Sequence, residues 1–154
     1  MDTIILWFLL FLGFILFGFI FRKPPIHYWL FTFLLTSYCS TFIGVIVVEK
    51  GMLEYPIRLL ANYFESSILY EYLLFPIICV YFCQHTYDST YKIWVIQAIF
   101  YNAFFTLVEI ILEHYTDLIH YYTWTWLYTF ISTFALMVII RTIVQFVPKK
   151  PTYS

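Results

Sequence analysis

The sequence predicts an all-α fold, a polytopic membrane bundle of five transmembrane helices with one short outer helix. Composition supports a membrane protein, because 63% of the 154 residues are hydrophobic and 11% are charged. Soluble domains have about 45–50% apolar and about 25% charged residues. Five apolar segments are also long enough to approach the roughly 20 helical residues that cross a hydrocarbon core. We expect residues 1–154 to form a single membrane domain.

The first two predicted spans cover about residues 3–21 and 27–48. The first is preceded by Asp2 and followed by Arg22 and Lys23. A cleavable secretory signal has basic residues before its apolar core and a small-residue cleavage site after it. We therefore expect the first span to be retained as a helix.

The third predicted span, about residues 67–83, is short and contains Pro76. Proline removes one backbone hydrogen bond and kinks or breaks a helix, which a membrane bundle tolerates where neighbours satisfy the freed carbonyl. The fourth and fifth spans, about 93–112 and 124–146, have no such interruption. Three groups of aromatic residues indicate anchoring at the membrane interfaces: Tyr28 and Trp29, Tyr91 and Trp94, and Tyr121, Tyr122, Trp124 and Trp126.

A short amphipathic helix is predicted at about residues 56–66, between the second and third spans. Pro56 suits a first helical turn, and Leu60, Tyr63 and Phe64 recur at nearly helical spacing. Such a helix would be interfacial, lying in the headgroup zone, or re-entrant, covering a cavity as a lid. Both alternatives stay open.

The distribution of basic residues predicts the N-terminus outside and the C-terminus in the cytoplasm. Cytoplasmic connections are enriched in Lys and Arg. This orientation leaves Lys50 and Arg58 outside and puts six basic residues inside: Arg22, Lys23, Lys92, Arg141, Lys149 and Lys150.

Polar residues form one stripe along the fourth span. Asn102, Thr106, Glu109 and Glu113 step by four, three and four residues, so they share one face of a helix. A charged side chain that faces lipid costs about 2.5–3.5 kcal/mol on insertion scales. We expect the stripe to face the interior of the bundle.

Other segments carry groups that could meet this stripe. Hydroxyls at Thr125, Thr129 and Ser132 share a face of the fifth span, and the second span has Ser37, Ser40, Thr41 and Gly44. Glu71 lies just inside the third span, in the same membrane half as Glu109. We hypothesise that Arg58 pairs with Glu109 or Glu71 and closes an outward-facing polar pocket.

The sequence indicates no metal, cofactor or nucleic-acid site. Glu109 and Glu113 share a face, but His114 points about 100° away, and the spacings of helical metal sites are missing. Phosphate-binding loops and nucleophile elbows are absent. No run of Lys or Arg exceeds two residues, so no nucleic-acid partner is expected. The lipid bilayer is the expected environment, with self-association or a larger membrane partner as open alternatives.

The layout resembles a family of small, functionally uncharacterised five-span membrane proteins of endospore-forming bacteria. The resemblance rests on four motifs: RKPP at 22–25, EYPIRL at 54–59, LLFPI at 73–77 and WTWLYTFIS at 124–132. It implies a multi-pass protein of the bacterial cell membrane and brings no activity with it.

The leading functional hypothesis is a non-enzymatic protein with an outward-facing polar pocket, acting as a binding, sensing or accessory subunit. The pocket residues would be Glu109, Glu113, Asn102, Thr106, Arg58, Glu71 and Thr129. A small proton- or cation-coupled transporter and a membrane-embedded enzyme acting on lipids or quinones are the alternatives.

Overall fold

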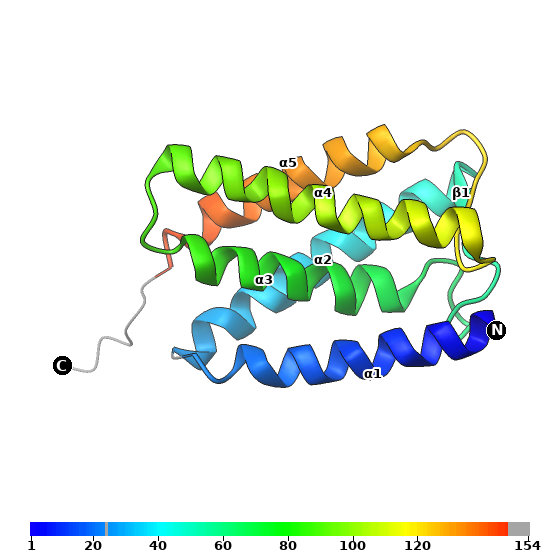
Figure 1. Ribbon diagram of the computed structural model, residues 1–154, viewed down its shortest axis with the longest axis horizontal. Coiled ribbons are helices and arrows are strands. Elements are labelled where there is room, and N and C mark those ends of the chain that lie inside the picture. Colours follow the sequence, from blue (N-terminus) through cyan, green and yellow to red (C-terminus); the bar gives the residue numbers. More distant parts are fainter. Residues whose placement is uncertain (24, 148–154) are drawn as a thin grey trace.

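The computed structural model describes residues 1–23 and 25–147 and is almost entirely helical. Its α-helices lie side by side along the long axis of the molecule (Figure 1). The elements follow in the order α1 (Asp2–Ile20), α2 (Ile26–Glu49), β1 (Leu53–Glu54), η1 (Leu69–Leu74), α3 (Phe75–Thr86), α4 (Tyr91–Tyr115), β2 (His120–Tyr121) and α5 (Trp126–Val144). The prediction of an all-α bundle is confirmed.

Four helices are long and apolar enough to cross a membrane, namely α1, α2, α4 and α5. They match the first, second, fourth and fifth predicted spans to within a few residues. The third predicted span is divided. Its first part is the π-helical segment η1, and its second part is α3, which has only 12 residues.

Pro76 explains why the third segment changes its helical form. Proline has no backbone N–H, so the carbonyl of Tyr72, four residues earlier, loses its usual helical donor. The hydroxyl of Ser37 on α2 donates to that carbonyl at 3.1 Å, and the hydroxyl of Ser40 donates to the Glu71 carbonyl at 2.6 Å. Helix α2 therefore supplies the hydrogen bonds that the irregular segment lacks.

Helix α3 occupies the centre of the bundle, and α1 lies at its edge. Nine of the 12 residues of α3 are buried, against three of the 19 in α1. The core around α3 contains Tyr28 and Trp29, which are 1% and 2% exposed, and the Tyr28 hydroxyl donates to the Val144 carbonyl at 2.9 Å. The predicted interfacial role of Tyr28 and Trp29 is therefore wrong, because their rings fill space between α2, α3 and α5.

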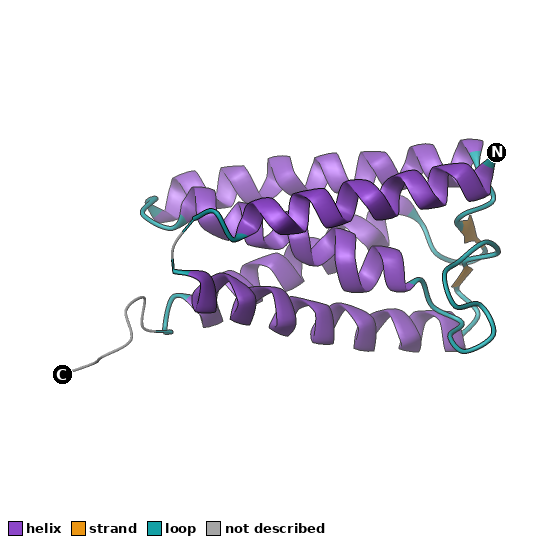
Figure 2. Ribbon diagram, turned by 90° about the horizontal axis from the view of Figure 1, so that it is seen from below, coloured by secondary structure: helices purple, strands orange, loops and turns teal. Residues whose placement is uncertain are grey.

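The two strands close one end of the bundle, called the β end here. Strand β1 pairs antiparallel with β2, with Leu53 opposite Tyr121. The backbone N–H groups of Tyr122, Thr123 and Trp124 all donate to the Met52 carbonyl at 3.0–3.1 Å. Figure 2 shows the pair at the end where the N-terminus lies. These bonds fix Tyr121 and Trp124 next to the ends of the helices.

The short helix predicted at residues 56–66 is absent, and that prediction is wrong. This stretch consists of turns and bends. Leu60 has a φ of 54°, in the left-handed region that interrupts a right-handed helix. The Arg58 side chain donates to the carbonyls of Tyr55, Phe64 and Ala61 at 2.8, 2.6 and 3.3 Å, so it organises the loop itself.

Replacing Arg58 with methionine is expected to loosen this loop without unfolding the bundle. The three carbonyls would turn to water, so the global cost should be about 1 kcal/mol. Amide hydrogen exchange across residues 59–64 should accelerate. Lys50→Met, which changes an exposed residue at the same end, is the control and should leave exchange unchanged. Equal exchange in both variants would contradict this account of the loop.

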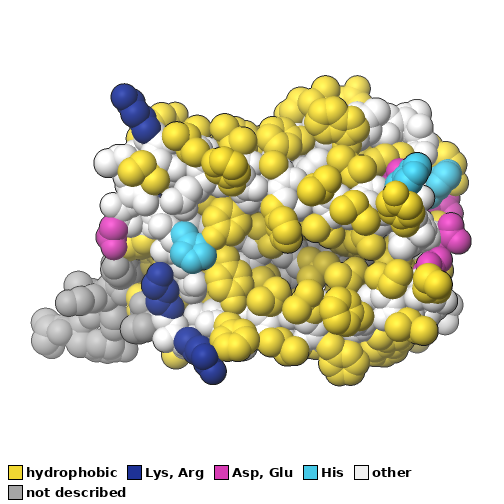
Figure 3. Space-filling view, viewed as in Figure 1, with side chains coloured by type: hydrophobic (Ala, Val, Ile, Leu, Met, Phe, Trp, Pro, Cys, Tyr) yellow, Lys and Arg dark blue, Asp and Glu magenta, His cyan; other side chains and the backbone are white. Residues whose placement is uncertain are grey.

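The two ends of the molecule differ in charge. On the face in Figure 3, Lys and Arg side chains lie near the end opposite the β end, where one acidic side chain also lies. Most of the acidic side chains gather at the β end. Lys149 and Lys150, which support the predicted orientation, and Pro24 of the RKPP motif lie outside the described residues.

Candidate functional site

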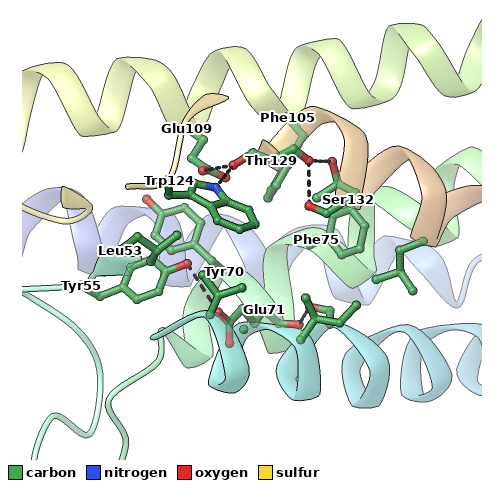
Figure 4. Close-up of a pocket in the computed structure, with 16 residues that line it drawn as sticks. Leu53, Tyr55, Tyr70, Glu71, Phe75, Phe105, Glu109, Trp124, Thr129 and Ser132 are labelled. Atoms are coloured by element: carbon green, nitrogen blue, oxygen red, sulfur yellow. Dashed lines mark hydrogen bonds between the residues drawn. The ribbon is translucent and has the colours of Figure 1, made fainter. Parts of the chain in front are cut away.

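A cavity of about 80 Å³ lies inside the half of the bundle nearest the β end (Figure 4). Its walls come from α2, η1, α4 and α5. Leu53, Tyr55 and Trp124, which belong to β1 and the loops, cover it from the β end. Phe75, Phe105 and Leu136 are buried and border it on the opposite side. Side chains therefore cover the cavity at both of its ends along the bundle axis.

Glu71 reaches the cavity from η1 and lies directly against Gly44 of α2. A Cβ atom at Gly44 would overlap both carboxylate oxygens, so the absence of a side chain there makes room for the acid. The Tyr55 hydroxyl donates to Oε1 at 3.5 Å. Within the described part of the chain, Oε2 is buried and has no hydrogen-bond partner. Glu71 is 8% exposed, so this oxygen is an unsatisfied acceptor inside the protein.

Glu109 reaches the same cavity from α4 and is held by a series of donors. Its Oε1 accepts hydrogen bonds from the Thr129 hydroxyl at 2.8 Å and from the Tyr121 hydroxyl. The indole N–H of Trp124 donates to the Thr129 hydroxyl at 2.6 Å. This series connects Glu109 to α5, to β2 and to the loop between them.

The tyrosines that contact the two acids are permanent donors. Burial raises the pKa of the Tyr55 phenol well above its usual range, and the Glu71 and Glu109 carboxylates raise it further. Burial, followed by the Glu109 charge, also raises the pKa of Tyr121. Both phenols therefore keep their protons at any physiological pH and can donate to a carboxylate.

The cavity contains two acids and no basic side chain. None of the described residues that line it is Lys, Arg or His. Burying an isolated carboxylate is so costly that the group takes up a proton or pairs with a cation. Each of these two buried acids therefore needs a proton or a nearby cation.

The polar stripe of α4 faces the interior, as predicted, but only part of it reaches the cavity. Asn102, Thr106 and Glu109 are 0%, 3% and 9% exposed. The Asn102 amide donates to the Phe130 carbonyl at 2.7 Å and accepts from the Thr133 hydroxyl, so Asn102 joins α4 to α5. Thr106 and the half-buried Glu113 do not line the cavity.

Of the seven predicted pocket residues, Glu71, Glu109 and Thr129 line the cavity. The predicted pairing of Arg58 with Glu109 or Glu71 is wrong, because the Arg58 guanidinium is bound to backbone carbonyls of its own loop. A group of three or more metal-ligating residues is not found within residues 1–23 and 25–147.

Several cavity residues were not predicted as pocket residues. The sequence pattern predicts an interfacial role for Trp124 and indicates no role for Tyr55 and Tyr70. It puts Gly44 on a polar helix face and does not predict the contact of Gly44 with Glu71. The signal available in the sequence was the glycine beside two serines on α2, a small-residue surface that a neighbouring side chain can enter.

Comparison with protein-family models, with curated proteins and with solved structures gave no match. The resemblance to small membrane proteins of endospore-forming bacteria stays a prediction. The proposed function therefore rests on the geometry of the cavity.

Proposed function

We propose that this chain is a five-span protein of the bacterial cell membrane that binds a small ligand in its cavity, as a binding or sensing subunit. The fifth span would be η1 and α3 together, from Leu69 to Thr86. Their 18 residues extend about 27 Å at helical rise, close to the thickness of a hydrocarbon core. Their central position in the bundle supports this assignment.

The proposed orientation puts the N-terminus and the β end outside. Arg22 and Lys23 follow the end of α1 and Lys92 lies in the first turn of α4, at the end of the bundle opposite the β end (Figure 1). Basic residues favour the cytoplasmic side. The cavity would then lie in the outer half of the membrane. Glu71 and Glu109 would face a chamber closed from the cytoplasm by Phe75, Phe105 and Leu136.

One observation carries the binding proposal: two carboxylates from different helices share a cavity that has no cationic side chain. A structural ion pair would need a basic partner. A transport path would have to pass Phe75, Phe105 and Leu136, three buried apolar side chains that border the cavity toward the cytoplasm. The arrangement is that of a binding site that complements positive charge.

The donor series around Glu109 supports a sensing role. Tyr121 and Trp124 both connect to Glu109, directly or through Thr129, and both belong to the β end. A ligand that donates a hydrogen bond to Glu109, in place of Tyr121 or Thr129, would change the positions of these aromatic side chains. Occupancy of the cavity would then be transmitted to the outer surface.

Nondenaturing mass spectrometry of gently extracted protein tests the binding proposal. The wild-type protein should retain a non-protein mass, and the double variant with Glu71→Gln and Glu109→Gln should lose it while keeping its thermal midpoint, because no ion pair is broken. Glu49→Gln, at an exposed acid of α2, should retain the mass. A wild-type protein without bound mass, or a double variant that still carries it, would contradict the proposal.

A further inference from the structure

The cavity opens sideways, between α2 and α5. Ten of its 16 lining residues are buried. Apart from Trp124, the lining residues that are half-buried or exposed all belong to these two helices: Ile43, Gly44, Val47, Ser132 and Thr133. The side toward the β end is covered by buried Leu53 and Tyr55. The cavity is therefore more accessible from the side of the bundle, between α2 and α5, than along the bundle axis.

This opening lies at the depth of the hydrocarbon core. Ile43 is six residues from the end of α2 at Glu49, and Ser132 is six residues from the start of α5 at Trp126. Six helical residues correspond to about 9 Å. Helix α2 is about 36 Å long by the same rise, against a hydrocarbon core of about 30 Å. The opening therefore faces lipid chains, and a ligand that uses it comes from the bilayer.

The volume limits how much of the ligand enters. A cavity of 80 Å³ is about half of an engineered apolar cavity of roughly 150 Å³ that admits benzene. A small head group fits, and a long chain does not. The remainder of the ligand would lie between α2 and α5, beside Ile43 and Val47, in contact with the bilayer.

The unsatisfied polar atoms define the head group. Among the described residues, Glu71 Oε2 and the Tyr70 hydroxyl are buried without a partner, and both residues line the cavity. The two bonds to Glu109 both end on Oε1, so Oε2 can accept another. A primary ammonium group has one positive charge and three N–H donors, as a lysine side chain does. A quaternary ammonium group has the charge but no donor.

We propose that the cavity binds a primary ammonium group carried on an aliphatic chain, which enters from the bilayer between α2 and α5. The ammonium would lie between Glu71 and Glu109, with Tyr70 as a third acceptor. This inference rests on the proposed binding function and names its ligand class. The source is either an aminolipid of the membrane or a free long-chain amine.

Calorimetric titration of the full chain in phosphatidylcholine nanodiscs tests the ligand class. Dodecylamine should bind, whereas dodecyltrimethylammonium and ethylamine should bind at least tenfold more weakly, because one lacks N–H donors and the other lacks the chain. Glu71→Gln should weaken dodecylamine binding at least tenfold. Equal binding of the primary and quaternary amines would overturn the proposal.

A bulky residue at the opening tests the route. Ile43→Trp should weaken dodecylamine binding at least tenfold, and Phe42→Trp, at a neighbouring residue that is 61% exposed and does not line the cavity, should not. Unchanged binding in Ile43→Trp would overturn lateral entry. If Ile43→Trp fails to fold, the titration of Glu71→Gln still tests the ligand class.

Two further results distinguish an aminolipid from a free amine as the ligand, and failure of the ligand class from failure of the binding function. If phosphatidylethanolamine in the nanodisc competes with dodecylamine, the source is an aminolipid; if it does not, the source is a free amine. If dodecylamine fails to bind while the wild-type protein still carries a mass that the double glutamine variant loses, the ligand class is wrong and the binding function stands. If neither is observed, both proposals fail.

Discussion

Replacing Gly44 with alanine is expected to weaken ligand binding and to destabilise the bundle, although alanine is the better helix former. The added methyl group would occupy the space of the Glu71 carboxylate. Overpacking of this kind costs about 1–3 kcal/mol, and the roughly 1 kcal/mol that alanine gains over glycine in a helix offsets part of this cost. The displaced carboxylate would no longer face Glu109, so dodecylamine affinity should fall at least tenfold.

Gly18→Ala is the matched control for this prediction. A Cβ atom at Gly18 would meet no described atom within 4 Å, so alanine there should be neutral or stabilising. Thermal unfolding in detergent and calorimetric titration in nanodiscs measure the two effects. If Gly44→Ala behaves like Gly18→Ala in both measurements, then Glu71 does not lie against α2 as described.

Replacing Arg141 with methionine is expected to cost about 3 kcal/mol of stability. Arg141 is 5% exposed and caps the C-terminal end of α3. Its Nη2 donates to the carbonyls of Thr86 and Tyr87 at 2.8 and 3.3 Å, and its Nε donates to the Thr86 hydroxyl at 3.2 Å. Hydrogen bonds to charged groups contribute about 1.5–3 kcal/mol, and a cation at a helix C-terminus adds to this. Methionine would leave the buried Thr86 carbonyl without this donor.

Thr142→Val on the same helix is the control for Arg141. The Thr142 side chain is exposed and donates to the Val138 carbonyl of its own helix, at 2.8 Å, so its loss should cost less than 1 kcal/mol. Arg141→Lys should be intermediate, because lysine keeps the charge but lacks the planar array of donors. A thermal midpoint in Arg141→Met equal to that of Thr142→Val would show that the cap does not support α3.

The sequence predicted the helices well because their signal is local. Long apolar runs identify α1, α2, α4 and α5. The steps of four and three residues between Asn102, Thr106 and Glu109 correctly predict that these side chains face the interior. Pro76 likewise marked the segment that needs help from a neighbouring helix. Each of these features depends on one segment and on the cost of exposing polar groups to lipid.

The errors concern contacts between distant segments. The helical spacing of Leu60, Tyr63 and Phe64 suggested a helix, but Arg58 stabilises a loop by bonding three carbonyls. Because these bonds hold the Arg58 guanidinium in the loop, it does not pair with Glu109 as predicted. The fit of Glu71 against Gly44 joins η1 to α2, and spacing along the chain contains no information about that contact.

Covalent labelling of Glu71 and Glu109 by a lipid-soluble and a water-soluble reagent is the most direct test of the claim that the cavity opens toward the bilayer. Dicyclohexylcarbodiimide, which partitions into lipid, should modify Glu71 or Glu109 in delipidated, reconstituted protein, and dodecylamine should protect them. A water-soluble carbodiimide should modify Glu54 at the β end and spare both buried acids. Peptide mass spectrometry would contradict the account if the water-soluble reagent alone reached Glu71 and Glu109, or if neither reagent did.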